Sequence, residues 1–472
     1  MNSHSIQTRI SLPLCLAAGL LLIREAENTC SGQPATNLPA EIVAYINAAE
    51  VRANEIARQN NFTLSSDVKS FIAESKAGRF EEAQRPYSNI RKTADSTNPG
   101  AELRTPIVEI ARDIELAINA FAGGDRALVV ALGKDYMDAL PPGCIYFGGT
   151  DPGRGLPTAL CHAPGDPFFV ISQNPLAAPV YMDYVRRLYG SRIKIPTTNE
   201  IDDCYYAYYS DASRRWQHDK QFPEQPKQLD QDETVTQQDG KPQFNGQGAT
   251  LRLDAFIAKK IFDSNPEREF YLEESYAMEW MKPYLTPAGA IMKINREPVP
   301  EITQEAINRD HTFWCNLSRR TVGDFVTYDT SVKDLCDFCE KVYLRHDESG
   351  FKGDPKFLRS AYTQKTYAKL RDSIAASIYQ ARAEVSNGSK ASPATKARML
   401  KEAEFAFKQA LAFYPASPEP IYHSMILLSS QQRFEEIKMI IHLAQKLDPK
   451  NPVYASWLGY LSKLPGNTNP EN

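Results

Sequence analysis

The chain repeats a pattern near its C-terminus at a spacing of 34 residues. The recurring pairs are Phe407 and Ile441, Ala410 and Ala444, Pro415 and Pro449, and Pro418 and Pro452. In a helical hairpin, small residues let the two helices approach, a larger apolar side chain fills the space between them, and proline ends the second helix. Because 34 residues is the tetratricopeptide period, the sequence predicts tetratricopeptide-like helical hairpins over residues 391–465.

Short apolar runs alternate with helix-like segments over residues 141–300. The runs are Cys144–Phe147, Phe168–Ile171, Ile193–Ile195, Glu269–Glu273 and Ala290–Ile294. This alternation is typical of strands joined by crossover helices, with the last run pairing at the edge of the sheet. The fold class that we predict is therefore an α/β middle domain with a mainly parallel sheet, plus α-helical segments at both ends.

The regions on either side of residues 141–300 have a pattern typical of helices. Apolar residues at helical spacing, such as Val68, Phe71 and Ile72, predict a helical N-terminal region over residues 38–140. Residues 301–390 form a predicted helical connector. Residues 217–249 contain many Gln, Asp, Lys, Pro and Gly, so we expect a mobile excursion or an exposed hairpin within the α/β domain.

The N-terminus carries an apolar stretch of 14 residues, Ile10–Ile23, which is preceded by Arg9. This length fits a signal peptide and falls short of the roughly 20 residues that span a bilayer. We therefore predict that residues 1–30 are a signal peptide or an anchor, and that the protein is exported, periplasmic or membrane-tethered. The alternative is a buried N-terminal helix. Membrane contact is expected through this segment alone.

Composition excludes some partners. The chain has 54 Lys and Arg against 58 Asp and Glu, a net charge of -4, so there is no overall basic field to hold a nucleic acid. Its 8 cysteines are scattered, whereas a disulfide scaffold packs many into a short chain. We expect no cofactor.

Polar residues follow several predicted strands. Carboxyl ends of parallel strands meet at one edge of a sheet, where open α/β folds bind ligands. This edge predicts a polar cleft for a hydroxyl-rich or phosphorylated ligand, with Arg154 adding charge. The alternative is a glycine turn with an Asp helix cap. The candidate ligand-binding residues are Thr150, Asp151, Arg154, Gln173, Asn174, Glu273 and Glu274.

Two other motifs favour structural roles. Cys336 and Cys339 have metal-like spacing, but there is no second pair and the segment reads as a helix, so no metal site is predicted. A group of aromatic residues could stack on a sugar or a base, or pack with one half on the sheet and the other at its rim. These aromatic residues are Tyr205, Tyr206, Tyr208, Tyr209 and Trp216.

The middle of the chain resembles a family of uncharacterised bacterial exported proteins with tetratricopeptide repeats. The matching segments are CIYFGGTDPGR at Cys144–Arg154, ISQNPLA at Ile171–Ala177, FYLEESYAMEWMKPYLTPAG at Phe270–Gly289 and GDP at Gly353–Pro355. More distantly, residues 144–195 are similar to the soluble C-terminal region of protein O-mannosyltransferase-like membrane proteins. The resemblance implies no catalytic residue for this chain.

No reaction is identifiable from the sequence. The first hypothesis is a binding or scaffolding protein of the cell envelope that holds a protein partner through its helical repeats. The second is a glycan-linked accessory or transferase-related domain that binds a sugar or sugar phosphate at the Asp151 strand edge.

Overall fold

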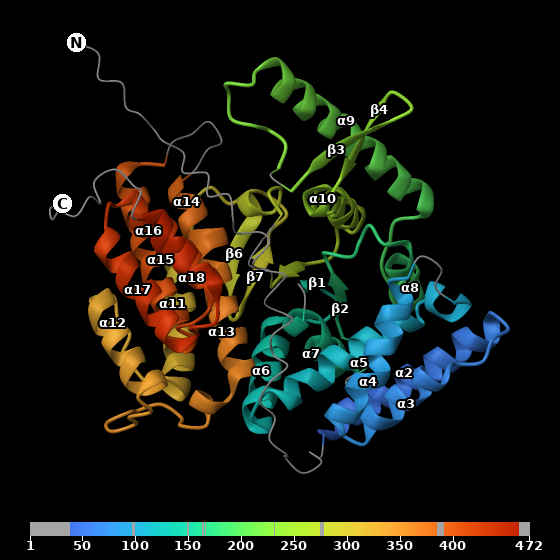
Figure 1. Ribbon diagram of the computed structural model, residues 1–472, viewed down its shortest axis with the longest axis horizontal. Helices are drawn as coiled ribbons and strands as arrows, with labels where there is room; N and C mark the ends of the chain where they lie inside the picture. The colour runs from blue at the N-terminus through green and yellow to red at the C-terminus, as the bar shows by residue number, and fades with distance from the viewer. Residues whose placement is uncertain are drawn as a thin grey trace.

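The computed structural model describes residues 38–96, 100–148, 151–162, 165, 167–230, 232–273, 278–384 and 391–461. The predicted signal segment at residues 1–30 lies outside them. The N-terminal helices lie on one side of a small central sheet and the C-terminal helices on the other (Figure 1). Among the described helices, none has the length and apolar character needed to cross a membrane.

Helices form the N-terminal region, as predicted. They are α2 (Ala40–Gln59), α3 (Ser66–Lys76), α4 (Phe80–Ala94), η1 (Ala101–Arg104), α5 (Ile107–Ala122) and α6 (Arg126–Ala139). Ser65 and Asp125 cap α3 and α6, because their side chains accept hydrogen bonds from backbone N–H groups of the first turn. Helix α5 is buried on most sides because α2, α3, α4 and α7 pack around it.

The central sheet has five strands in the order β2-β1-β5-β7-β6. They are β1 (Ile145–Gly148), β2 (Phe169–Ser172), β5 (Phe270–Leu272), β6 (Leu285–Ala288) and β7 (Ile291–Ile294). Strand β1 pairs in parallel with β2 and with β5, and helix α7 (Asp151–His162) connects β1 to β2. The α/β prediction is thus confirmed for this half of the sheet.

The other half of the sheet is antiparallel, which makes the sheet mixed. Strand β7 pairs antiparallel with β5 and with β6. Between β6 and β7 lie only Gly289, with φ 65°, and Ala290, and a connection this short can join only antiparallel strands. The predicted edge position of β7 was wrong, because β6 forms this edge of the sheet. The sequence of β6, Leu285–Ala288, contains a proline and was not predicted to be a strand.

Ile193–Ile195 is not a strand, which corrects a further prediction. Ile193 is buried, but the backbone of Lys194 is satisfied by a side chain and not by a neighbouring strand. Asn265 accepts the N–H of Lys194 at 2.8 Å and donates to its carbonyl oxygen at 2.9 Å. One amide side chain therefore replaces a strand partner, which an apolar run in the sequence could not indicate.

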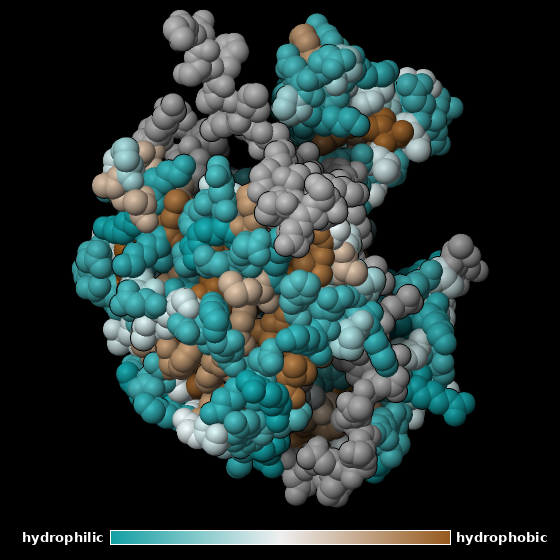
Figure 2. Space-filling model, turned by 60° about the vertical axis from the view of Figure 1, so that its left-hand side comes forward, coloured by the Kyte–Doolittle hydropathy of each residue, from teal (hydrophilic) through white to brown (hydrophobic). Residues whose placement is uncertain are grey.

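Residues after β2 form α8 and then an arm that projects from the sheet (Figure 1). Helix α8 spans Pro179–Tyr189. The elements of the arm are α9 (Thr198–Gln221), β3 (Thr234–Gln238), β4 (Lys241–Asn245) and α10 (Gln247–Ser264). The predicted exposed hairpin is present as the antiparallel pair β3 and β4, although the polar excursion begins inside α9. The arm has a mainly hydrophilic surface (Figure 2) and its own small apolar cluster, separate from the main core.

The C-terminal part is helical. Its elements are α11 (Gln304–Thr321), α12 (Val332–Cys339), η3 (Glu340–Leu344), η4 (Phe357–Arg359), α13 (Ala361–Ile374), η5 (Ala375–Gln380), α14 (Ala381–Glu384), α15 (Pro393–Phe413), α16 (Pro418–Ser430), α17 (Phe434–Leu447) and α18 (Pro452–Leu461). From α15 to α18, each helix packs on the next. Both η3 and η5 are π-helical.

The helical part packs directly against the sheet. Helix α13 contacts β7, and η5 contacts β6. Arg382 of α14 donates hydrogen bonds to the carbonyl oxygens of Lys282 at 2.8 Å and Pro283 at 2.9 Å, just before β6. Apolar side chains of the N-terminal helices, the sheet and the C-terminal helices consequently form one continuous core.

Candidate functional site

The strand order places a topological switch point between β1 and β5. The chain leaves β1 toward β2 on one side, and leaves β5 toward β6 and β7 on the other. In open α/β sheets, ligands bind in the crevice outside the carboxyl ends of two such strands. Here these ends are Gly148 on β1 and Leu272 on β5, followed by Glu273.

Glu273 lies at this switch point with its side chain fully buried. Its backbone N–H donates to the carbonyl oxygen of Phe147 at 3.2 Å and extends the pairing of β5 with β1. Its carboxylate lies against Gly153 in the first turn of α7, where a Cβ atom would come within 1.6 Å of Oε2. Any larger residue at this position would therefore force the carboxylate of Glu273 to shift.

Lys369 and Tyr136 lie near Glu273, and Tyr146 packs against Tyr136. Lys369 of α13 places Nζ 3.3 Å from Oε1 of Glu273. Tyr136 of α6 and Tyr146 of β1 are fully buried and meet edge to face, with ring centroids 6.3 Å apart. Burial, and next the charge of Glu273, raise the pKa of Tyr136 well above its usual value. We name Tyr136, Tyr146, Glu273 and Lys369 the switch-point cluster.

Arg154 does not contribute its charge to this edge. Its side chain is buried in the N-terminal helical layer, where Nε donates to Asp113 at 2.5 Å and Nη2 donates to Glu109 at 2.7 Å. Tyr184 donates to the second oxygen of Asp113. Although burial opposes it, the charges of Asp113 and Glu109 raise the pKa of Arg154. The expectation that Arg154 would meet a ligand is therefore not supported, because its guanidinium is already paired.

Gln173 and Asn174 follow the neighbouring strand β2. Gln173 is buried, and its backbone N–H donates to the carbonyl oxygen of Gly148 at 3.0 Å. Asn174 is half-buried. Thr150 and Glu274 lie outside the described residues, and Asp151 begins α7 without a described side chain. Of the predicted residues, Glu273 is the one that the structure places at the switch point with its carboxylate defined.

Asp254 of α10 is an acidic residue that the sequence reasoning missed. It is fully buried and accepts the N–H of Ala177, in the loop after β2, at 2.6 Å. Burial raises the pKa of Asp254 to about 8. The available signal was an acid on the apolar stripe that continues through Ile257, Ala258 and Ile261 at helical spacing.

The motifs outside the sheet have structural surroundings. Cys336 and Cys339 lie on helix α12, as predicted, and burial raises the pKa of Cys336 to about 12. His311 instead contacts Glu402 at 2.8 Å. Across the described ranges, no group of three or more His, Cys, Asp and Glu side chains is arranged to hold a metal ion.

The predicted aromatic group lies on α9 and packs away from the sheet. Tyr208 is buried against Phe244 of β4 and donates to Glu233 at 3.0 Å, whereas Tyr205 and Tyr206 are exposed. The expectation that one half of the group packs on the sheet was wrong, because α9 packs on α10 and β4.

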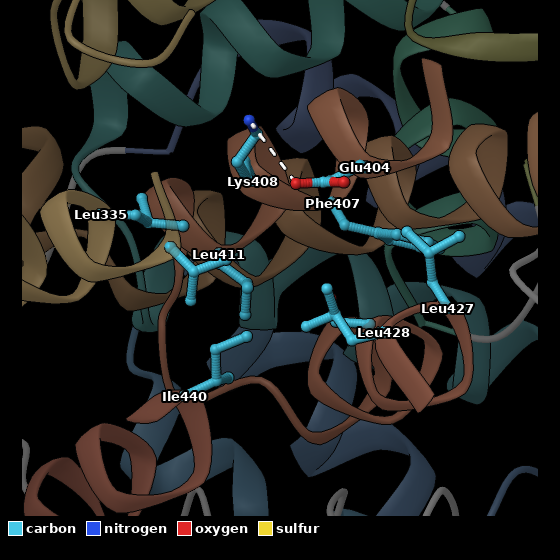
Figure 3. Close-up of a pocket in the computed structure, with 10 residues that line it drawn as sticks. Leu335, Glu404, Phe407, Lys408, Leu411, Leu427, Leu428 and Ile440 are labelled. Carbon is cyan, nitrogen blue, oxygen red and sulfur yellow. Dashed lines mark ion pairs between the residues drawn. The ribbon is translucent and has the colours of Figure 1, made fainter. Parts of the chain in front are cut away.

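A small cavity lies among the C-terminal helices (Figure 3). Side chains from α12, α15, α16 and α17 line it, including Leu335, Leu411 and Ile440. Its volume of about 10 Å³ holds at most one water molecule. Lys408 and Glu404 pair at 3.9 Å at its side, so this cavity is a packing defect beside an ion pair and does not coincide with the switch point.

The chain has no significant match among protein-family models, curated proteins or solved structures.

Proposed function

We propose that the protein is a binding or scaffolding protein that holds a protein partner through α15–α18, acting as tetratricopeptide-type hairpins. The observation that carries the proposal is the packing of each helix on the next, with the repeated small residues Ala410 and Ala444 fully buried between them. Tyr454 of α18 donates to the carbonyl oxygen of Ala416 at 2.8 Å and ties the last helix to the preceding connection. Stacked hairpins present surfaces that hold extended or helical segments.

The surface that we propose for the partner lies on α18, the last helix of the stack. The helices before it are occupied within the molecule, because α13 and η5 pack on the sheet and residues 405–413 of α15 are buried. Helix α18 instead exposes the small residues Ala455 and Ser456. We therefore place the partner surface on α18.

A single substitution on α18 tests this. Ala455→Arg puts a long charged side chain on the exposed face, and Ala397→Arg, at an exposed alanine of α15, is the matched control. We expect Ala455→Arg to lose partners in pull-downs from envelope extracts and Ala397→Arg to retain them. An unchanged partner set for Ala455→Arg contradicts the proposal. Deleting residues 394–472 is a poorer test, because it removes the buried Phe407 and Phe413.

A second candidate function is binding of a sugar or sugar phosphate at the switch point, as a glycan-linked accessory domain. The specific observation is the pair formed by the buried Glu273 and the half-buried Lys369 where the carboxyl ends of β1 and β5 meet. Glu273→Gln should weaken binding of a sugar found in a panel of sugars, sugar phosphates and sugar nucleotides. Glu279→Gln, at a side chain that is 72% exposed, should not. If no member of the panel binds the unaltered protein, this function is excluded.

Export remains part of the proposal. It rests on the apolar stretch Ile10–Ile23. A cleaved signal predicts a mature chain that begins between about residue 19 and residue 31. Intact-mass measurement of protein from the native host tests this, and a full 53.0 kDa chain in the cytoplasmic fraction contradicts it.

A further inference from the structure

The projecting arm carries exposed aromatic side chains on helix α9. Tyr205 is 43% exposed and Tyr206 is 68% exposed, which makes Tyr206 the most exposed large apolar or aromatic side chain of the described residues. The surface of the arm around them is mainly hydrophilic (Figure 2). Exposed tyrosines on a polar surface are typical of protein interfaces, because the ring is buried by the partner while the hydroxyl stays hydrated.

Ring packing holds this aromatic group in place. The rings of Tyr205 and Tyr209 stack with centroids 6.5 Å apart, and Tyr205 meets Tyr206 edge to face at 6.1 Å. Tyr209 in turn meets Phe244 of β4 edge to face at 5.6 Å. A partner that binds these rings therefore finds them ordered beforehand, which lowers the entropy that binding costs.

The arm is also the acidic part of the chain. Residues 198–264 contain 12 Asp and Glu against 8 Lys and Arg, which is a net charge of -4. The rest of the chain contains 46 of each kind and has no net formal charge. Because the arm stands away from the body of the molecule (Figure 1), its negative charge favours the approach of a cationic partner.

Asp202 brings a negative charge to the aromatic side chains. It is exposed and precedes Tyr205 by three residues and Tyr206 by four, so the three side chains share one face of α9. Within the described residues no ion pair forms to Asp202, whereas five of the eight Lys and Arg side chains of the arm pair with other acids. These pairs are Arg214 with Asp211, Arg215 with Asp211 and Glu233, Arg252 with Asp230, Lys259 with Asp263, and Lys260 with Glu200.

We propose that Asp202, Tyr205, Tyr206 and Tyr209, here named the arm face, bind a segment of a partner protein that is rich in arginine or lysine. A cation over a tyrosine ring is attracted by the negative face of the ring, and a carboxylate one turn away pairs with the same or the next cation. The arm face is separate from α18, so this inference goes beyond the proposed function and does not depend on it.

Cationic peptides test the inference on the full chain. The probes are a fluorescein-labelled peptide of alternating Arg and Gly, and the same peptide with Lys or with Glu in place of Arg. Fluorescence anisotropy follows their binding at low and at high salt. We expect the Arg peptide to bind, the Lys peptide to bind more weakly because its ammonium group stacks less well on a ring, and the Glu peptide not to bind. Binding should weaken as salt rises.

Two variants locate the binding. Tyr206→Ala and Asp202→Asn change exposed side chains, and each should weaken binding of the Arg peptide by about threefold to fivefold. The matched control is Asp239→Asn, which removes the same charge from the same arm at the turn between β3 and β4. The backbone there has φ 51°, which asparagine tolerates, so binding should be unchanged.

Several outcomes would overturn the inference. They are absence of binding by both cationic peptides, equal binding of the Glu peptide, and equal weakening by Asp202→Asn and Asp239→Asn, which would show a general attraction of charges. Self-association that Tyr206→Ala abolishes in analytical ultracentrifugation would assign the arm face to a second copy of the chain, which also contradicts the inference. Pull-downs with Ala455→Arg test α18 separately, so failure of one proposal is distinguishable from failure of the other.

Discussion

Buried acids in the helical layers and buried acids at the carboxyl edge of the sheet have different partners. In the helices, Asp310 receives a hydrogen bond from Arg371 at 2.8 Å and another from Tyr379 at 2.8 Å, and both Asp310 and Arg371 are buried. At the sheet edge, Glu273 has a lysine contact of 3.3 Å, and Asp254 receives a backbone N–H with no described ion pair.

This difference separates buried charges that an arginine partner stabilises from buried charges that lower the stability of the fold. Arginine presents a planar fork that satisfies a carboxylate from fixed directions, which makes it suited to buried pairs between helices. An acid that is buried without such a partner lowers stability and shifts its pKa, and such acids gather at functional sites. We therefore interpret Asp254 as the acid that is buried at a cost in stability, whereas Lys369 offsets the charge of Glu273.

The largest expected effect comes from the Asp310 and Arg371 pair. Arg371→Ala leaves the carboxylate of Asp310 buried without its cation, and should lower the free energy of unfolding by about 3–5 kcal/mol. Arg309→Ala breaks a pair whose side chains are 67% and 82% exposed, and should change it by less than about 0.5 kcal/mol. Urea denaturation measures both. Equal losses of stability in the two variants would show that the buried pair of Asp310 and Arg371 does not stabilise the fold more than an exposed pair does.

Replacing Asp254 should raise the free energy of unfolding, in contrast to replacing Arg371, and the gain should depend on pH. Its folded-state pKa of about 8 lies above its ordinary value of 3.8, so the unfolded chain loses the proton first as pH rises. Its stability penalty is absent below about pH 4, grows by about 1.4 kcal/mol per pH unit, and levels off above about pH 8. Relative to Asp254→Asn, the unaltered protein should lose about 3 kcal/mol between pH 5 and pH 7. The measurement is the free energy of unfolding by chemical denaturation as a function of pH. If this free energy varies with pH in the same way in the unaltered protein and in Asp254→Asn, Asp254 is not a buried acid without a compensating charge.

Gly153 tests the close approach of Glu273 to α7. In Gly153→Ala the new methyl group meets the Glu273 carboxylate, with Oε2 at 1.6 Å and Cδ at 2.4 Å, so this fully buried side chain must shift. We expect a loss of about 1–3 kcal/mol, as for overpacking. Gly459→Ala on α18 is the control, because a Cβ there meets no atom of the described residues within 4 Å, and helix propensity predicts a small gain. Thermal unfolding of both variants distinguishes the sites, and a neutral Gly153→Ala would show that the carboxylate moves freely.

The smallest effect concerns His423, whose partner in the helices is Asp372 at 2.8 Å. Although burial opposes it, the charge of Asp372 raises the pKa of His423, and Glu419 adds to this while Lys282 opposes it. The stabilisation by the protonated imidazole is therefore complete below the unfolded-state pKa and is lost as pH rises through the higher folded-state pKa. His423→Gln should cost more stability at pH 5.5 than at pH 9. A cost that does not vary with pH would assign His423 a packing role alone.

The predictions from the sequence succeeded where local pattern decides the structure. The helices of the two end regions, strands β1, β2 and β5, and the hairpin in the polar excursion follow from periodicity and composition, whereas helix α9 (Thr198–Gln221) was not predicted. The strand predicted at Ile193–Ile195 was wrong because Asn265, 71 residues after Lys194, satisfies the backbone of Lys194. Strand β6 was missed because its pairing depends on the two-residue turn at Gly289 and not on an apolar run.

At the candidate site the sequence determined which side chains are available, because residues that follow parallel strands reach one edge whatever packs around them. Only the tertiary structure decided how they are used. It turned Arg154 toward Glu109 and Asp113, and it brought Lys369 and Tyr136 to Glu273 from helices far away in the chain. Burial, ion pairing and pKa depend on atoms within a few ångströms, and those neighbours come from segments whose approach no local pattern encodes.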